Sequence, residues 1–324
     1  MFQTEPILYL QSHASGALHY VFVIWNHLGT TAVALLICAF LFGIEGKKGF
    51  TLLHLVVVVA ILSELLKDFF ALPRPLFVDN NIQYLDNVRE NDAPFRAMGA
   101  DSFFGPLPQQ VIDYYRASGT QHWGLPSGHV SSTFVAWMGL ALLQKKRWLA
   151  VLATVVTIAV ALARMYVGKH FLADVLAGAL LGGLLLTLSY IFIIRPDRLR
   201  KAPAGLTLRT SDKPLLAYLL FAPLPLLFAQ TSQTVAIACL LGINVGFVVA
   251  KGLPAVMNNG KKNNGLPAGV LAVATLLALG WLFQSTVGAA ANIHVAVQAI
   301  TAALLCCVFI IAGRWFGPLS RSIS

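Results

Sequence analysis

The stretch FLADVLAGALLGGLLLTLSYIFII occupies residues 171–194 and carries a single charge, Asp174. Its length matches the roughly 20 apolar residues that an α-helix needs to cross the hydrocarbon core of a bilayer. Similar runs recur along the chain, which is 57% hydrophobic and only 11% charged, with a mean hydropathy of +0.74. Soluble domains carry about 25% charged residues. The sequence therefore predicts an all-α polytopic membrane protein, because a bilayer leaves no water to bond an unpaired backbone.

We expect about nine transmembrane helices, since nine apolar runs are long enough to cross a bilayer. One outer connection, residues 73–126, is long and contains charged and aromatic residues, so we expect a small folded cap there. The nine expected spans cover residues 19–43, 51–72, 127–143, 148–165, 171–194, 214–230, 233–250, 267–284 and 293–312.

Lys and Arg are concentrated in alternate connections between these spans. Five connections hold 16 of the 23 Lys and Arg residues and only three acidic residues. The positive-inside rule then places these connections in the cytoplasm and the N-terminus outside. The net charge of +10 thus reflects topology, and we expect no nucleic-acid partner. The basic connections are 44–50, 144–148, 195–213, 251–265 and the tail after 312.

The cysteines and the N-terminus contribute little chemistry. Cys38, Cys239, Cys306 and Cys307 all fall inside apolar spans, which is typical of small buried residues rather than of a disulfide or metal set. No basic segment precedes the first span, so we do not expect a cleaved signal peptide.

Three cations lie at helix ends on the expected outer face. Lys67 ends the second span, Arg74 follows seven residues later, and Arg164 ends the fourth span. A cation at the edge of hydrocarbon is costly unless it binds an anion. Arg offers a planar fork that fits phosphate oxygens, and Lys offers a point charge. The three side chains together predict a phosphate-binding site.

The third span opens with Pro126-Ser127-Gly128-His129. Proline suits a first helical turn, where its missing N–H costs nothing. Ser127 and Gly128 would present a hydroxyl and unshielded N–H groups at a helix N-terminus, which favours an anion. This segment therefore supplies the other half of the predicted phosphate cradle.

Two histidines supply reactive groups beside these cations. His170 and Asp174 are four residues apart, so we expect them to share one helix face. The carboxylate can accept a hydrogen bond from one ring nitrogen and leave the other nitrogen free as a nucleophile. His129 can protonate the leaving oxygen as a general acid. No cluster of Asp, Glu and His resembles a two-metal site, so we expect no metal and no cofactor.

These motifs together resemble the type-2 phosphatidic acid phosphatase superfamily. They are K-x6-R-P from Lys67, P-S-G-H from Pro126, and R-x5-H-x3-D from Arg164. The resemblance implies a six-helix phosphatase core in residues 1–230 and an additional three-helix region in residues 231–324. It also implies a metal-independent lipid phosphatase of the bacterial inner membrane, with its site on the periplasmic face and the bilayer and a lipid phosphate as partners.

The resemblance also assigns a role to each motif residue. It makes His170 the nucleophile, Asp174 the residue that orients it and His129 the general acid. The family usually has a serine before the arginine of the third motif, where this chain has Ala163. We expect this change to alter phosphate affinity or substrate preference rather than to abolish activity. The implied phosphate ligands are Lys67, Arg74, Ser127, Gly128 and Arg164.

Three functions remain open from the sequence. The first is hydrolysis of a lipid phosphate or pyrophosphate, such as polyprenyl (pyro)phosphate, phosphatidate or phosphatidylglycerol phosphate, through a phosphohistidine. The second is a phosphatase of a soluble ester, since glucose-6-phosphatases are similar in having nine spans and an outward N-terminus. The third is a phospholipid transporter or binding protein without turnover, which the three extra spans favour and the oriented His170–Asp174 pair opposes.

Two further polar residues lie within apolar spans. Glu64 stands one turn before Lys67, and an intramembrane carboxylate is a functional candidate by default. Pairing with Lys67 is the simpler interpretation. His54 has the character of a helix-packing residue.

The charge pattern generates a direct test of topology. Because residues 73–126 lie opposite the basic connections, cysteines introduced by Asn80→Cys and Lys146→Cys should react with an impermeant thiol reagent from opposite sides of the membrane. Labelling of both from one side would contradict the predicted orientation.

Overall fold

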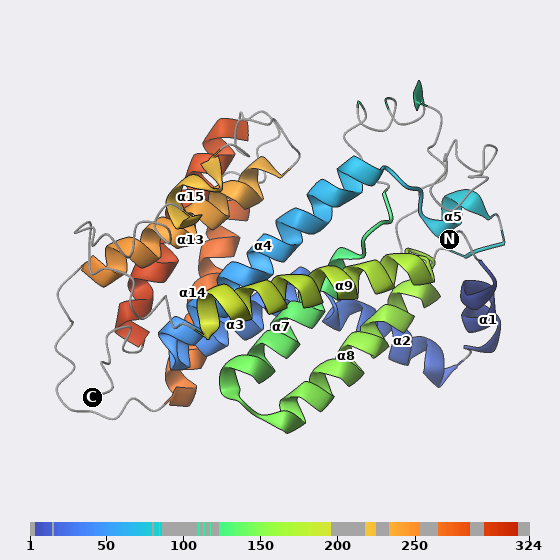
Figure 1. Cartoon of the computed structure of the whole chain (residues 1–324), viewed down its shortest axis with the longest axis horizontal. Coiled ribbons are helices and arrows are strands. Elements are labelled where there is room, and N and C mark those ends of the chain that lie inside the picture. The colour runs from blue at the N-terminus through green and yellow to red at the C-terminus, as the bar shows by residue number, and fades with distance from the viewer. Residues whose placement is uncertain are drawn as a thin grey trace. The chain divides into compact units, whose positions relative to one another are not determined.

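The computed structural model describes residues 4–14, 16–79, 81–83, 85, 109–110, 113, 117, 123–195, 218–224, 233–252, 265–285 and 295–316. Within these residues the chain is helical and has no strand beyond an isolated bridge (Figure 1). Among the described helices, five are long and apolar enough to cross a membrane, or six with one bent pair counted as a span. The helical membrane class is therefore confirmed, whereas the nine-span count and the outward N-terminus stay predictions.

The described chain forms two compact units. Unit 1 comprises residues 1–34 and 62–186, and unit 2 comprises residues 35–61 and 187–324. The expected division at residue 230 stays a prediction, and most of the expected cap and of the sixth span lies outside the described residues. The helices are α1 (Glu5–His13), α2 (Ala17–Leu28), α3 (Thr31–Ile44), α4 (Gly46–Phe70), α5 (Pro75–Val78), α7 (Gly128–Gln144), α8 (Arg147–Tyr166), α9 (Leu172–Ser189) with a π-helical turn to Ile194, α13 (Thr234–Gly252), α14 (Gly265–Phe283) and α15 (Val295–Phe316).

The first expected span, residues 19–43, is not one continuous helix. It is divided into α2 and α3, which are bent by 58°. A Cβ at Gly29 would overlap a methyl carbon of Val160 on α8, so only glycine allows this approach. The hydroxyl of Thr133 donates to the carbonyl of Gly29 at 3.4 Å and supports the broken turn. The break between α2 and α3 depends on packing against α8 and α7, which an apolar run in the sequence does not reveal.

Helices α7, α8 and α9 form the scaffold of unit 1, with α7 and α8 joined by a short turn (Figure 1). Small residues let α9 approach α7 closely. A Cβ at Gly178 would lie 2.5 Å from the carbonyl oxygen of Ser127, and one at Gly182 would lie 3.2 Å from that of Ser131. The opposite face of α9 exposes leucines every fourth residue, as expected of a lipid-facing surface: Leu172, Leu176, Leu180, Leu184 and Leu188.

Unit 2 contains a buried polar connection between its helices. The Nδ1–H of His54 on α4 donates to the amide oxygen of Asn244 on α13 at 2.8 Å, because an amide oxygen can only accept. The Nε2 of the same ring accepts from the Tyr218 hydroxyl at 2.9 Å. Both ring nitrogens are thus satisfied, and the prediction that His54 is a packing residue is confirmed.

The contact between α9 and α7 predicts a selective effect of two glycine substitutions. Gly178→Ala should destabilise the protein by roughly 1–3 kcal/mol, because the methyl group must displace the backbone at Ser127. Gly183→Ala is the matched control, since its Cβ would meet nothing closer than 3.9 Å. Thermal unfolding of the two detergent-purified variants gives the comparison. Equal melting temperatures would contradict the close approach of the two helices.

Candidate active site

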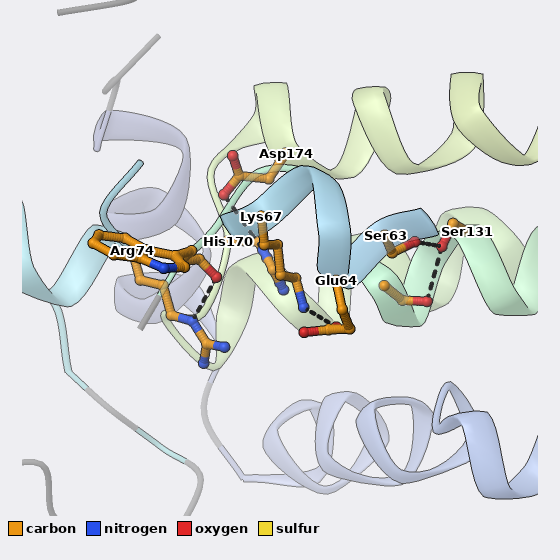
Figure 2. Close-up of polar contacts among 9 residues, drawn as sticks. Ser63, Glu64, Lys67, Arg74, Ser131, His170 and Asp174 are labelled. Atoms are coloured by element: carbon orange, nitrogen blue, oxygen red, sulfur yellow. Dashed lines mark hydrogen bonds and ion pairs between the residues drawn. The ribbon is translucent and has the colours of Figure 1, made fainter. Parts of the chain in front are cut away.

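Three cations from separate segments of unit 1 lie within electrostatic range of His170. Lys67 lies in the last turn of α4, Arg74 directly precedes α5, and Arg164 lies in the last turn of α8. Lys67 and Arg164 are buried, with 7% and 3% of their surface exposed. Figure 2 shows Lys67, Arg74 and His170 in the same region of unit 1. The structure thus brings together the cations that the sequence assigned to one phosphate site.

The start of α7 lies beside these cations. The helix begins at Gly128, with Ser127 as its N-cap residue, so Pro126 lies outside the first turn in which it was expected. A Cβ at Gly128 would stand 3.6 Å from the Nζ of Lys67. The Ser127 hydroxyl is buried and has no hydrogen-bond partner among the described residues. A helix N-terminus with an unused hydroxyl next to a cation is suited to an anion.

His170 and Asp174 are in contact, but not on one helix as expected. His170 lies in the connection between α8 and α9, and Asp174 lies in the first turn of α9. The Nδ1 of His170 lies 3.3 Å from Oδ2 of Asp174, and that oxygen also accepts the N–H of Phe171 at 3.0 Å. The carboxylate therefore caps α9 and orients the imidazole, with Nε2 left for other chemistry.

The surroundings of His170 favour its neutral form. Only 1% of its surface is exposed. Burial, with added repulsion from Arg164, Arg74 and Lys67, lowers the pKa of His170 well below its usual range. Its ring is therefore neutral near pH 7 and keeps a lone pair on one nitrogen, which a nucleophile requires.

Backbone contacts fix the cradle against the His170 segment. The N–H of Ser127 donates to the carbonyl of Asp174 at 2.9 Å. A Cβ at Gly124 would lie 2.8 Å from Oδ2 of Asp174, so this position leaves room for the carboxylate. The N–H of Gly124 also donates to the carbonyl of Leu72 at 2.8 Å, which ties the segment to the residues that follow α4. Both hydrogen bonds join backbone atoms. They therefore hold the three motifs together and leave the motif side chains available for other contacts.

Two supporting groups were absent from the sequence prediction. The amide oxygen of Asn26 on α2 accepts from Nη1 of Arg164 at 2.6 Å. The carbonyl of Trp123 accepts from Nε of Arg74 at 3.3 Å. Asn26 is buried within an apolar helix, with 5% of its surface exposed. The only sequence signal for this role is a polar amide within an apolar stretch, because a buried amide needs a hydrogen-bond partner.

The remaining candidates from the sequence are His129, Glu64 and Ala163, and they lie on different helices of unit 1. His129 lies half-buried in the first turn of α7, within electrostatic reach of Arg164 and Lys67. The pairing of Glu64 with Lys67 is confirmed, because Oε1 lies 2.5 Å from Nζ (Figure 2). Ala163 is fully buried. The described residues contain no group of three or more His, Cys, Asp and Glu side chains that could hold a metal ion.

Comparison with known families agrees with this geometry. Residues 48–197 match the PAP2 superfamily, and this part of the chain belongs to the type-2 phosphatidic acid phosphatase superfamily. The matched segment contains all of the motif residues, from Lys67 to Asp174. Membership supports a phosphatase-type function. Comparisons with curated proteins and with solved structures give no match.

The buried contact of Asn26 predicts a role in anion binding. Asn26→Leu should weaken binding of orthovanadate, an anion with the shape of phosphate, by about ten-fold, because a hydrogen bond to a charged group contributes roughly 1.5–3 kcal/mol. Titration of the purified variant by calorimetry gives the affinity. His27→Leu, at the exposed neighbouring position, serves as the control. Unchanged vanadate affinity in Asn26→Leu would exclude Asn26 from the support of Arg164.

Proposed function

We propose that the chain is a metal-independent membrane phosphatase that hydrolyses a lipid phosphate or pyrophosphate through a phosphohistidine at His170. The candidate substrates are polyprenyl (pyro)phosphate, phosphatidate and phosphatidylglycerol phosphate. The observation that carries the proposal is the oriented His170–Asp174 contact beside buried cations. Binding alone would need the cations, whereas an imidazole with one nitrogen held by a carboxylate serves group transfer.

In the first step, Nε2 of His170 attacks the phosphorus atom. The bond from phosphorus to the ester or anhydride oxygen breaks, and His129 donates a proton to the departing oxygen. The Nδ1 proton stays on the hydrogen bond to Asp174, which stabilises the positive charge that develops on the ring. The first product is the dephosphorylated lipid, or the lipid monophosphate when a pyrophosphate is cleaved.

In the second step, water attacks the phosphorus atom of the phosphohistidine. His129, now without its proton, accepts one from this water, and the bond between phosphorus and Nε2 breaks. Inorganic phosphate leaves and both histidines regain their initial states. Lys67, Arg74, Arg164 and the N–H groups at the start of α7 stabilise the equatorial oxygens in both steps.

The substrate proposal rests on the position of the site at helix ends. A phosphate held by Lys67 and Arg164 leaves its chain level with one leaflet of the bilayer, and the charge pattern of the connections favours the outer leaflet. Exposed Phe69 and Phe70 at the end of α4 offer an apolar surface next to Lys67. These features favour a lipid over a sugar phosphate and a site on the outer side of the membrane, which would be the periplasmic side of the proposed bacterial inner membrane.

His170→Ala should abolish turnover, because no other group replaces the attacking Nε2. The variant should keep its melting temperature and its affinity for orthovanadate, since the cations of the cradle remain. The measurement is release of phosphate from long-chain lipid phosphates in detergent micelles. His13→Ala, at an exposed histidine on α1, is the control. Near-normal turnover by His170→Ala would remove His170 from the role of nucleophile.

A substrate panel separates the lipid proposal from the soluble one. Long-chain lipid phosphates should be hydrolysed with a kcat/KM at least ten-fold above that for glucose 6-phosphate, a gap of about 1.4 kcal/mol in transition-state stabilisation. The assay uses one preparation in mixed micelles for all substrates. Equal or better hydrolysis of the sugar phosphate would favour a phosphatase of soluble esters. Tight phosphate binding without turnover of any substrate would favour a transporter or binding protein.

A further inference from the structure

A carboxylate lies against one of the cations of the site, Lys67. Glu64 stands one turn before Lys67 on α4, and its Oε1 lies 2.5 Å from the Lys67 ammonium. The two side chains are only 21% and 9% exposed. A site for a phosphate anion is expected to exclude other anions, because like charges at close range in a partly dry site repel each other strongly. The presence of this carboxylate therefore needs an explanation.

The Glu64 carboxylate also faces the start of α7. A Cβ at Gly128 would lie 3.4 Å from its Oε1 and 3.6 Å from the Nζ of Lys67. The ion pair and the proposed cradle thus meet at the same glycine, and Figure 2 shows Glu64 beside Lys67 with Ser63 one position earlier on the helix. A phosphate bound by Lys67 and by the first turn of α7 would lie next to this carboxylate.

We propose that Glu64 is a positioning residue that competes with phosphate for Lys67. In the empty site the carboxylate holds the ammonium in place and balances its charge. When phosphate binds, the Lys67 ammonium donates to the phosphate oxygens instead of to Glu64. When product phosphate leaves, the ion pair with Glu64 forms again. This inference rests on the proposed function and adds to it a device for product release.

The physical reason lies in the free energy of the phosphate site when no anion is bound. Removing the anion from a site with several buried cations would leave their charges uncompensated, which is strongly unfavourable. Such a site would hold inorganic phosphate and turn over slowly. Glu64 lowers the free energy of the empty state, and it thereby weakens the binding of phosphate product.

The sign of one binding change distinguishes this role from a structural one. If Glu64 only supported Lys67, Glu64→Gln would weaken the binding of phosphate. If Glu64 competes, Glu64→Gln should lower the inhibition constant for orthophosphate and the dissociation constant for orthovanadate by three-fold or more. Glu64→Asp should restore values close to those of the original protein. Asp113→Asn, which removes an exposed negative charge elsewhere, is the control.

The outcomes separate the two proposals. Unchanged or weaker binding of both anions by a folded Glu64→Gln protein overturns the competing role, even if the original protein hydrolyses lipid phosphates. Tighter anion binding by the variant supports the role even if no phosphate ester is hydrolysed, in which case only the proposed function fails. Glu64→Ala provides the same comparison if the Gln variant does not fold.

A separate observation concerns unit 2. Helices α3, α4, α13, α14 and α15 enclose a cavity of about 210 Å³. Its lining is apolar apart from two thiols, and it includes Leu53 on α4, Ile243 on α13, Leu276 on α14 and Phe309 on α15. Protein interiors contain few voids larger than a water molecule. Water is a poor occupant here, because a buried water needs two to four polar partners.

The wall of this cavity is open at Gly280 of α14. The residue is exposed and also lines the cavity, and a Cβ built on it would meet no atom within 4 Å. The helices that form the wall include three of those apolar enough to cross a bilayer. The medium next to this opening is therefore hydrocarbon, and the chain of a membrane lipid is the occupant that matches the lining.

We infer that the cavity binds one hydrocarbon chain of a membrane phospholipid, which enters beside Gly280. A hydrocarbon chain matches the cavity in volume and in apolar character. Filling the cavity with the chain removes the free-energy cost of an empty cavity. Leucine at position 280 would extend into the space that the chain occupies. It should not disturb α14, because leucine favours a helix more than glycine does.

Photolabelling tests this site directly. The protein is reconstituted in vesicles of phosphatidylethanolamine and phosphatidylglycerol that contain a phosphatidylcholine probe with a diazirine in its acyl chain, and labelled peptides are identified by mass spectrometry. Gly280→Leu should reduce labelling of α14 and of the Cys306 segment of α15 at least five-fold. Ala278→Leu, at an exposed position that does not line the cavity, should leave it unchanged. Equal labelling of the Gly280→Leu and Ala278→Leu variants would show contact with surrounding lipid only and would overturn the inference.

Discussion

The placement of cations in a nearly dry site is the constraint on which the rest of unit 1 depends. Lys67 and Arg164 are more than nine-tenths buried at the ends of apolar helices, where an uncompensated charge is strongly unfavourable. Glu64 and Asn26 each bind one of these cations, but an amide carries no charge. A bound anion would offset the net positive charge of such a site. This accounts for the presence of buried cations at the ends of apolar helices.

The same constraint explains why the backbone around the site is so closely tied. Electrostatic stabilisation of a transferring phosphoryl group depends on donors that are already in place before reaction. The bond from the Ser127 N–H to the Asp174 carbonyl joins the helix start that binds phosphate to the turn that holds the nucleophile. Gly124 and Gly178 allow the close approaches beside this bond. Packing between helices thus sets the geometry on which the proposed chemistry relies.

The sequence predicted the helical membrane class and the grouping of the motif residues, because apolar runs and charged helix ends are local signals. It did not predict the break at Gly29, the support of Arg164 by Asn26 or the position of His170 before α9. These features depend on contacts between segments far apart in the chain, as the sequence separation of 138 positions from Asn26 to Arg164 illustrates. A spacing of four residues was interpreted as a shared helix face, whereas Asp174 caps the helix and meets His170 from its first turn.

The central claim is that phosphate is transferred to the nitrogen of His170 before water releases it. The most direct measurement is rapid acid-free quenching of the protein with a lipid phosphate labelled with ³²P, followed by digestion and identification of the labelled peptide. The account predicts a label that is stable to base and lost in acid, located on the peptide that contains His170. A label on another residue, or turnover with no covalent label under conditions in which phosphate release is slowed, would contradict it.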